Sequence, residues 1–125
     1  MQYLLDTHAL IWWLANEPSL DPNAKTEIAN PNNLIFVSAA STWEISIKKA
    51  LKKLESPKDI MEQIAKNKFK LLPINFEETL IIETLSPYHQ DPFDRILIAQ
   101  AKLFELTIIT RDRKFSLYDI SLLKC

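Results

Sequence analysis

The segment YHQDPFDR at residues 88–95 places two aspartates just ahead of the apolar run ILIAQA. Asp91 precedes Pro92, which is the usual pattern of an N-cap followed by the first helical residue. Asp94 then falls at the third helical position, where a negative charge suits the helix dipole. Two carboxylates at the start of a buried helix could therefore serve capping alone, or they could hold a metal ion.

Three more acids are expected at the same edge of a sheet. Asp6 directly follows the apolar strand QYLL, and Asp112 lies two residues past the β-branched strand TIIT. Glu44 lies near the start of the helix that follows the strand LIFV (34–37). Because the carboxyl ends of parallel strands meet at one edge of a sheet, we expect these acids to converge with Asp94.

Four converging carboxylates oppose one another's ionisation, and a divalent cation relieves this repulsion. Oxygen ligands suit Mg²⁺ or Mn²⁺, and two such ions ~3.5–4 Å apart can activate water and stabilise the leaving oxygen of a phosphodiester. A structural role stays open for each acid. Asp6 could cap a helix, Asp112 could begin a turn, and Ser41 and Glu44 fit a capping box.

The order of elements predicts an α/β fold, a three-layer α/β/α sandwich with a central, mostly parallel sheet, formed by residues 1–125 as a single domain. The helix at 38–54 is expected to bury one face and to carry its lysines on the outer face. We expect a helix start at Ser56–Pro57 and an edge strand within 118–123. Strands are expected at 2–5, 34–37, 69–74 and 106–110. The apolar positions on the expected buried face of the helix at 38–54 are Ala40, Trp43, Ile47, Ala50, Leu51 and Leu54.

Composition excludes several classes of protein. The chain of 125 residues contains no glycine, so a glycine-rich phosphate loop is excluded. Its single cysteine is compatible with the reducing cytoplasm, and we expect neither a signal peptide nor a membrane span. Two histidines provide no zinc cluster or Ser–His–Asp arrangement. The net charge of −1 argues mildly against a nucleic-acid binder, but bound metal ions would make the balance positive.

Two residues near the aspartates have both a structural and a functional interpretation. His89 is expected to form hydrogen bonds within its loop and not to act as a base. Arg95 is expected to pair with the neighbouring acids, or to contact phosphate.

Five segments carry a resemblance: LLDTHALIWWL, VSAASTWEISIKKALKKL, LLPI, HQDPFDRILIAQA and TIITRDRKF. In this order and spacing the chain resembles the PIN-domain ribonucleases, and most closely the VapC-type toxins of type II toxin–antitoxin pairs. The resemblance implies a cytoplasmic endoribonuclease that uses Mg²⁺ or Mn²⁺, forms a homodimer and is bound by a cognate antitoxin. It assigns catalysis and metal binding to Asp6, Glu44, Asp94 and Asp112, and supporting roles to Asp91 and Arg95; possible RNA contacts are Lys48, Lys49, Lys52, Arg111 and Arg113.

Members of this group often have glycine at two helix ends where this chain has KKALKKL and Glu105–Leu106, so we expect unusual geometry there. Two rival functions remain. One is a catalytically silent PIN-like binding module that acts through a partner protein. The other is a phosphatase of the haloacid-dehalogenase type, but that chemistry requires a second aspartate two residues after Asp6, and this chain has His8 there.

Overall fold

The computed structural model, which describes residues 1–54 and 59–125, has a five-stranded sheet with the order β3-β2-β1-β4-β5. All neighbouring strands in it are parallel. The central strand β1 therefore has a partner on each side, and the other strands are added outward from it. The strands are β1 (Gln2–Leu5), β2 (Leu34–Ser38), β3 (Lys70–Leu72), β4 (Thr107–Thr110) and β5 (Leu122–Lys124).

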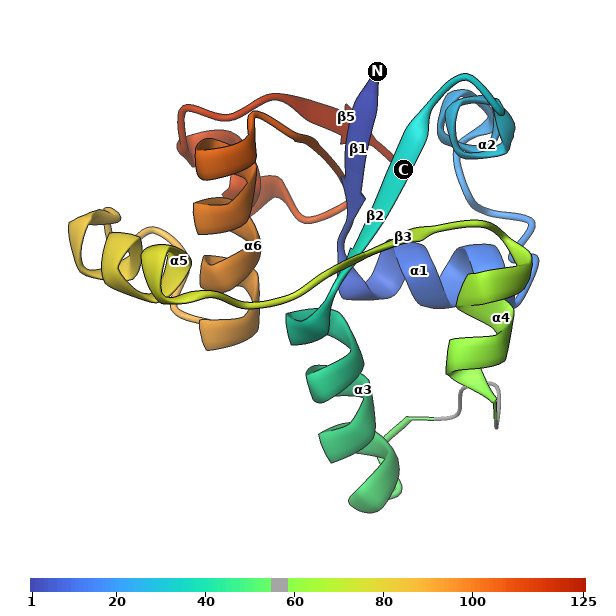
Figure 1. Ribbon diagram of the computed structural model, residues 1–125, viewed down its shortest axis with the longest axis horizontal. Helices are drawn as coiled ribbons and strands as arrows, with labels where there is room; N and C mark the ends of the chain where they lie inside the picture. The colour runs from blue at the N-terminus through green and yellow to red at the C-terminus, as the bar shows by residue number, and fades with distance from the viewer. Residues whose placement is uncertain (55–58) are drawn as a thin grey trace.

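Helices cover both faces of the sheet, which confirms the predicted three-layer sandwich. Figure 1 shows α1, α2 and α4 on one side of the strands and α5 and α6 on the other. Successive side chains of a strand point to opposite faces, so Leu4 and Leu5 of β1 enter two separate cores, and both are fully buried. The helices are α1 (Thr7–Leu14), α2 (Pro22–Ala29), α3 (Ala39–Ala50), α4 (Ile60–Lys66), α5 (Phe76–Ile81) and α6 (Pro92–Phe104), with 3₁₀ turns η1 (Ile82–Thr84) and η2 (Arg113–Leu117).

The predicted buried face of the helix at 38–54 is wrong for most of its residues. Ala40 is buried and Leu54 packs against one core, but Trp43, Ile47 and Leu51 are exposed, whereas Glu44 and Ile45 are buried. α3 contacts α1, α6 and β2, and its Glu44 side faces α1 through the hydrogen bond from Thr7. Trp43 instead makes an edge-to-face contact with Phe93 of α6, with ring centroids 4.9 Å apart.

Other boundaries also differ from the sequence prediction. α3 ends at Ala50 and not at residue 54. The last strand is only Leu122–Lys124, paired in parallel with β4. The predicted start at Ser56–Pro57 lies outside the described residues, and the described part of that helix begins at Ile60. Within the part of the chain that the structure describes, no helix is both long and apolar enough to cross a membrane.

The two helix ends that lack glycine keep a glycine-like backbone. Lys52, just past α3, has φ of 56°, and Glu105, just past α6, has φ of 55°. A residue with a Cβ costs about 1 kcal/mol or more in this left-handed region. The helices therefore end as an αL cap requires, at a local steric cost that glycine would avoid.

We predict that Glu105→Gly stabilises the protein by about 0.5–1 kcal/mol, because it relieves the αL strain at the end of α6. Lys102→Gly, inside the same helix at an exposed position, should instead destabilise it by about 1 kcal/mol. Urea unfolding of both variants gives the comparison. Equal destabilisation by the two substitutions would contradict the assignment of strain to Glu105.

Candidate active site

Asp6 follows β1 and connects several parts of the fold through one carboxylate. Its Oδ1 accepts a hydrogen bond from the Ala9 amide at 2.7 Å, so Asp6 is the N-cap of α1. This capping role was one of the two interpretations of Asp6 from the sequence. Its Oδ2 accepts from the hydroxyl of Thr110, at the end of β4, at 2.5 Å. The Asp6 side chain is almost completely buried, and burial raises its pKa, although the hydrogen bonds from Thr110 and Ala9 oppose the rise.

Asp112 is joined to Asp6 through the same threonine. The Asp112 amide donates to Thr110 Oγ1 at 3.0 Å, and Asp112 Oδ1 in turn accepts from the Lys114 amide at 2.9 Å, which caps η2. Burial alone would raise the pKa of Asp112. The hydrogen bonds from Lys114 and His89 outweigh it, so the pKa lies below its usual value and Asp112 stays ionised.

Glu44 is not part of a capping box, because α3 is capped by Ser38. Its side chain is buried and points back toward the end of β1. There, Thr7 donates to Glu44 Oε1 at 2.7 Å, and Lys48 Nζ lies 2.8 Å from Glu44 Oε2. This ion pair, helped by the nearby charges of Asp91 and Asp94, raises the pKa of Lys48.

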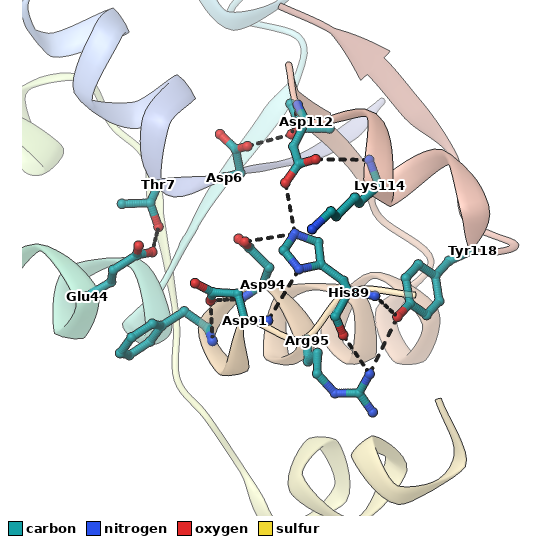
Figure 2. Close-up of polar contacts among 12 residues, drawn as sticks. Asp6, Thr7, Glu44, His89, Asp91, Asp94, Arg95, Asp112, Lys114 and Tyr118 are labelled. Carbon is teal, nitrogen blue, oxygen red and sulfur yellow. Dashed lines mark hydrogen bonds and ion pairs between the residues drawn. The ribbon is translucent and has the colours of Figure 1, made fainter. Parts of the chain in front are cut away.

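Asp91 and Asp94 divide two roles between them, as Figure 2 shows. Asp91 Oδ1 accepts from the amides of Phe93 and Asp94 at 2.9 and 3.1 Å, so Asp91 is the N-cap of α6. Asp94 makes no capping bond and turns its carboxylate toward His89, with Oδ2 at 3.0 Å from Nε2. The sequence prediction of a capping Asp91 is therefore confirmed.

Asp94 shows most clearly that the carboxylates converge. Burial, followed by the negative charges of Asp91, Asp6, Glu44 and Asp112, raises the pKa of Asp94 to about 8. The other three predicted acids thus lie within electrostatic reach of Asp94. Among the described residues, His89, Asp94 and Asp112 form a group whose three ligand atoms all lie within 4.8 Å of one another.

Four of the basic residues predicted near RNA have different surroundings. Lys48 is engaged by Glu44 beside the acids, whereas Lys52 is exposed beyond the end of α3. Arg111 donates to the carbonyls of Cys125 and Ser19 and lies over the ring of Trp12, 4.0 Å from its centroid. Arg113 is exposed.

Among the described residues, Arg95 forms no ion pair with the neighbouring acids. Its guanidinium donates to backbone carbonyls of the segment before α6, those of Ile82, Leu85, Ser86 and His89. The planar five-donor fork of arginine is suited to such a set of acceptors, and it fixes the loop that carries His89. Arg95 therefore supports the site through the backbone and not by ion pairing.

Three residues near the acids were not predicted as functional. Thr7 and Thr110 orient Glu44 and Asp6, and each stands within two residues of a predicted acid, which was the available signal. His89 was predicted to form hydrogen bonds within its loop. Its Nδ1 does accept from the Asp91 amide at 3.4 Å within the loop, and its Nε2 also reaches Asp94 and, at 2.8 Å, Asp112 across 23 residues of sequence.

Nearly the whole chain matches one family of known proteins. The sequence profile of the PIN domain matches residues 3–120. The chain belongs to the PIN-domain family. No curated protein matches it by sequence.

The fold of this PIN domain is also found in solved structures. It is similar to a chain in the crystal structure of VapBC2 from Rickettsia felis bound to a promoter DNA fragment, with a TM-score of 0.74, 14% identity and coverage of 100% of this chain and 99% of that one. It is also similar to a chain of the DNA-bound VapBC from Salmonella typhimurium, with a TM-score of 0.72, 15% identity and coverage of 99% of this chain and 98% of that one. For a toxin–antitoxin complex from Klebsiella pneumoniae, the TM-score is 0.63, the identity 22% and the coverage 97% of this chain and 95% of that one. At these identities the likeness shows the fold.

The raised pKa of Asp94 predicts how the stability of the metal-free protein depends on pH. Between about pH 4 and pH 8 the folded protein keeps a proton that the unfolded chain has lost, so stability falls as the pH rises through this window. Asp94→Asn cannot ionise. In EDTA it should be more stable than the wild type at pH 8, by about 2 kcal/mol, and should show a shallower pH dependence.

Urea unfolding at pH 5, 6.5 and 8 measures this difference. Asp119→Asn, which removes an exposed carboxylate beside the C-terminal end of α6, serves as the control and should follow the wild type. The same pH slope for Asp94→Asn and the wild type would show that Asp94 is not the group that keeps the proton.

Proposed function

We propose that the protein is a metal-dependent endoribonuclease and the toxin of a type II toxin–antitoxin pair. The observation that carries this proposal is the convergence of carboxylates on Asp94, whose pKa is raised to about 8 by burial and then by the negative charges of the acids around it. A fold does not keep such a group for stability, since ionised carboxylates at close range repel one another. A cation that binds there removes the repulsion.

The donor set fits Mg²⁺ or Mn²⁺. The candidate ligands Asp6, Glu44, Asp94 and Asp112 offer only carboxylate oxygens, which hard divalent ions prefer. When bound, such ions lower the pKa of a water and neutralise charge that develops on a phosphodiester. The chain's own contribution is to hold these carboxylate oxygens in place through Thr7 and Thr110. The oxygens would then bind each ion directly or through a water molecule. Asp94 must lose its proton on binding, so metal affinity should rise with pH.

A cavity beside Asp112 provides a place for the RNA backbone. It has a volume of about 350 Å³, and Asp112 lies in its wall together with Arg113 of η2 and Lys124 of β5. Neither cationic side chain has a hydrogen-bond or ion-pair partner within residues 1–54 and 59–125. Free positive charge next to a candidate metal ligand favours a phosphate of the strand that is cut.

Partners follow from the same proposal. The similar solved structures include toxin–antitoxin complexes, so we infer a cognate antitoxin for this chain, together with a homodimer and a cytoplasmic site of action. An antitoxin that covers the acidic edge of the sheet would present basic groups to it, because the carboxylates there lack full compensation.

We predict that the purified protein cuts cellular RNA into discrete fragments with Mn²⁺ and leaves it intact with EDTA. Asp6→Asn and Asp94→Asn should each lower cleavage by about 100-fold or more, because each removes the charge of a candidate ligand. Glu62→Gln, which removes an exposed carboxylate of α4, is the matched control and should cut normally. Intact RNA in every lane would favour the silent binding module.

We also predict that Arg113→Gln weakens RNA binding without altering the metal site. In an Asp6→Asn background, fluorescence anisotropy with a single-stranded oligoribonucleotide should show lower affinity and a salt dependence reduced by about one phosphate contact. Lys102→Gln, at the far end of α6, is the control and should leave both quantities unchanged. An unchanged salt dependence for Arg113→Gln would remove this residue from the RNA path.

A further inference from the structure

His89 bridges two of the candidate metal ligands. Its Nε2 lies 3.0 Å from Asp94 Oδ2 and 2.8 Å from Asp112 Oδ2 (Figure 2). These carboxylates come from different elements, the first turn of α6 and the cap of η2. Apart from His89, no side chain that the structure describes is hydrogen-bonded or ion-paired to both of them.

The hydrogen bonds of the ring decide which nitrogen carries its proton. Nδ1 faces the amide of Asp91 at 3.4 Å, and an amide can only donate, so Nδ1 is the acceptor. With Nδ1 as the acceptor, the ring proton resides on Nε2, which donates to Asp112 Oδ2 and lies 3.0 Å from Asp94 Oδ2. A nitrogen that carries a proton has no lone pair to offer a metal ion. The same contact therefore argues against His89 as a metal ligand.

The ring is also held from behind. His89 is buried, and its ring meets Phe115 edge to face with centroids 5.4 Å apart. Its backbone amide donates to the hydroxyl of Tyr118 at 2.9 Å, and its carbonyl accepts from Arg95 at 2.9 Å. The ring and the backbone of His89 are thus both held in place, which leaves the side chain little freedom to move away from Asp94 and Asp112.

We propose that His89 is a positioning residue that sets the separation of Asp94 and Asp112 for the metal ion, because its Nε2 donates a hydrogen bond to Asp112 and lies in contact with Asp94. This inference rests on the proposed metal site. One ring nitrogen in contact with both carboxyl groups holds an oxygen of each close together while no cation is present, so less reorganisation is needed when the cation binds. Removing the donor should weaken metal binding by about 10–100-fold, as for other groups that orient metal ligands.

The test uses three substitutions and Mn²⁺ binding to the metal-free full chain, followed by calorimetry. His89→Gln places an amide nitrogen near the position of Nε2, whereas His89→Asn reaches only as far as Nδ1 and His89→Ala removes both. We expect Mn²⁺ affinity to fall strongly for Ala and Asn and to be largely retained for Gln. Gln90→Ala, at the exposed neighbouring position, is the control and should bind like the wild type.

A spectroscopic measurement separates positioning from ligation. Pulsed electron paramagnetic resonance of the Mn²⁺-loaded wild type should show no coupling to a directly bound imidazole nitrogen. Such a coupling, or equal Mn²⁺ affinity for the wild type, Ala and Asn variants, would overturn the positioning role. A wild type that binds no Mn²⁺ would overturn the proposed function as well, whereas normal binding by every variant would overturn the role of His89 alone. Thermal unfolding in EDTA identifies any variant that fails to fold, and the Gln–Asn comparison then decides.

Discussion

The Asp6 carboxylate is the contact on which the arrangement of the site depends. One oxygen closes the first turn of α1, and the other takes the hydroxyl of Thr110, whose own oxygen accepts the Asp112 amide. The central strand, the helix after it and the turn after β4 are thereby fixed to one side chain. Since neighbouring parallel strands end at the same edge, this short chain of bonds determines where the acids from β1 and β4 meet.

The cost of this arrangement is concentrated negative charge. Asp6 is buried with both oxygens hydrogen-bonded, and Glu44 is relieved by the ammonium group of Lys48. Asp112 is relieved by an amide and an imidazole, which keep it ionised. Asp94 has no such compensation, and burial together with the surrounding charges raises its pKa to about 8. The protein therefore compensates Glu44 and Asp112 internally, and it leaves Asp6 and Asp94, whose pKa values are both raised, to be relieved by a cation.

The sequence was sufficient for the layers, for the order of the strands along the chain and for the convergence of the four acids near one sheet edge, because these follow from local periodicity and from the rule on strand ends. It failed where tertiary packing decided. The apolar stripe with Trp43 and Ile47 predicted a buried face of α3, but Glu44 is the side that packs. His89 was assigned a role within its own loop, and its contact with Asp112 spans 23 residues, which no local pattern can show.

Capping and chemistry are not alternatives for most of these acids. Asp6, Asp91 and Asp112 each use one oxygen to accept the amides of a following helical turn. A cap of this kind fixes the χ angles of a short side chain, so the second oxygen points in a defined direction without further support. Asp94 and Glu44, which cap nothing, depend instead on side chains such as His89 and Thr7. An acid that caps a helix after a parallel strand is thus well placed to act as a ligand, because the cap orients its free oxygen. Substitution of such an acid by asparagine removes the charge but keeps an accepting oxygen for the cap, whereas substitution by alanine removes both.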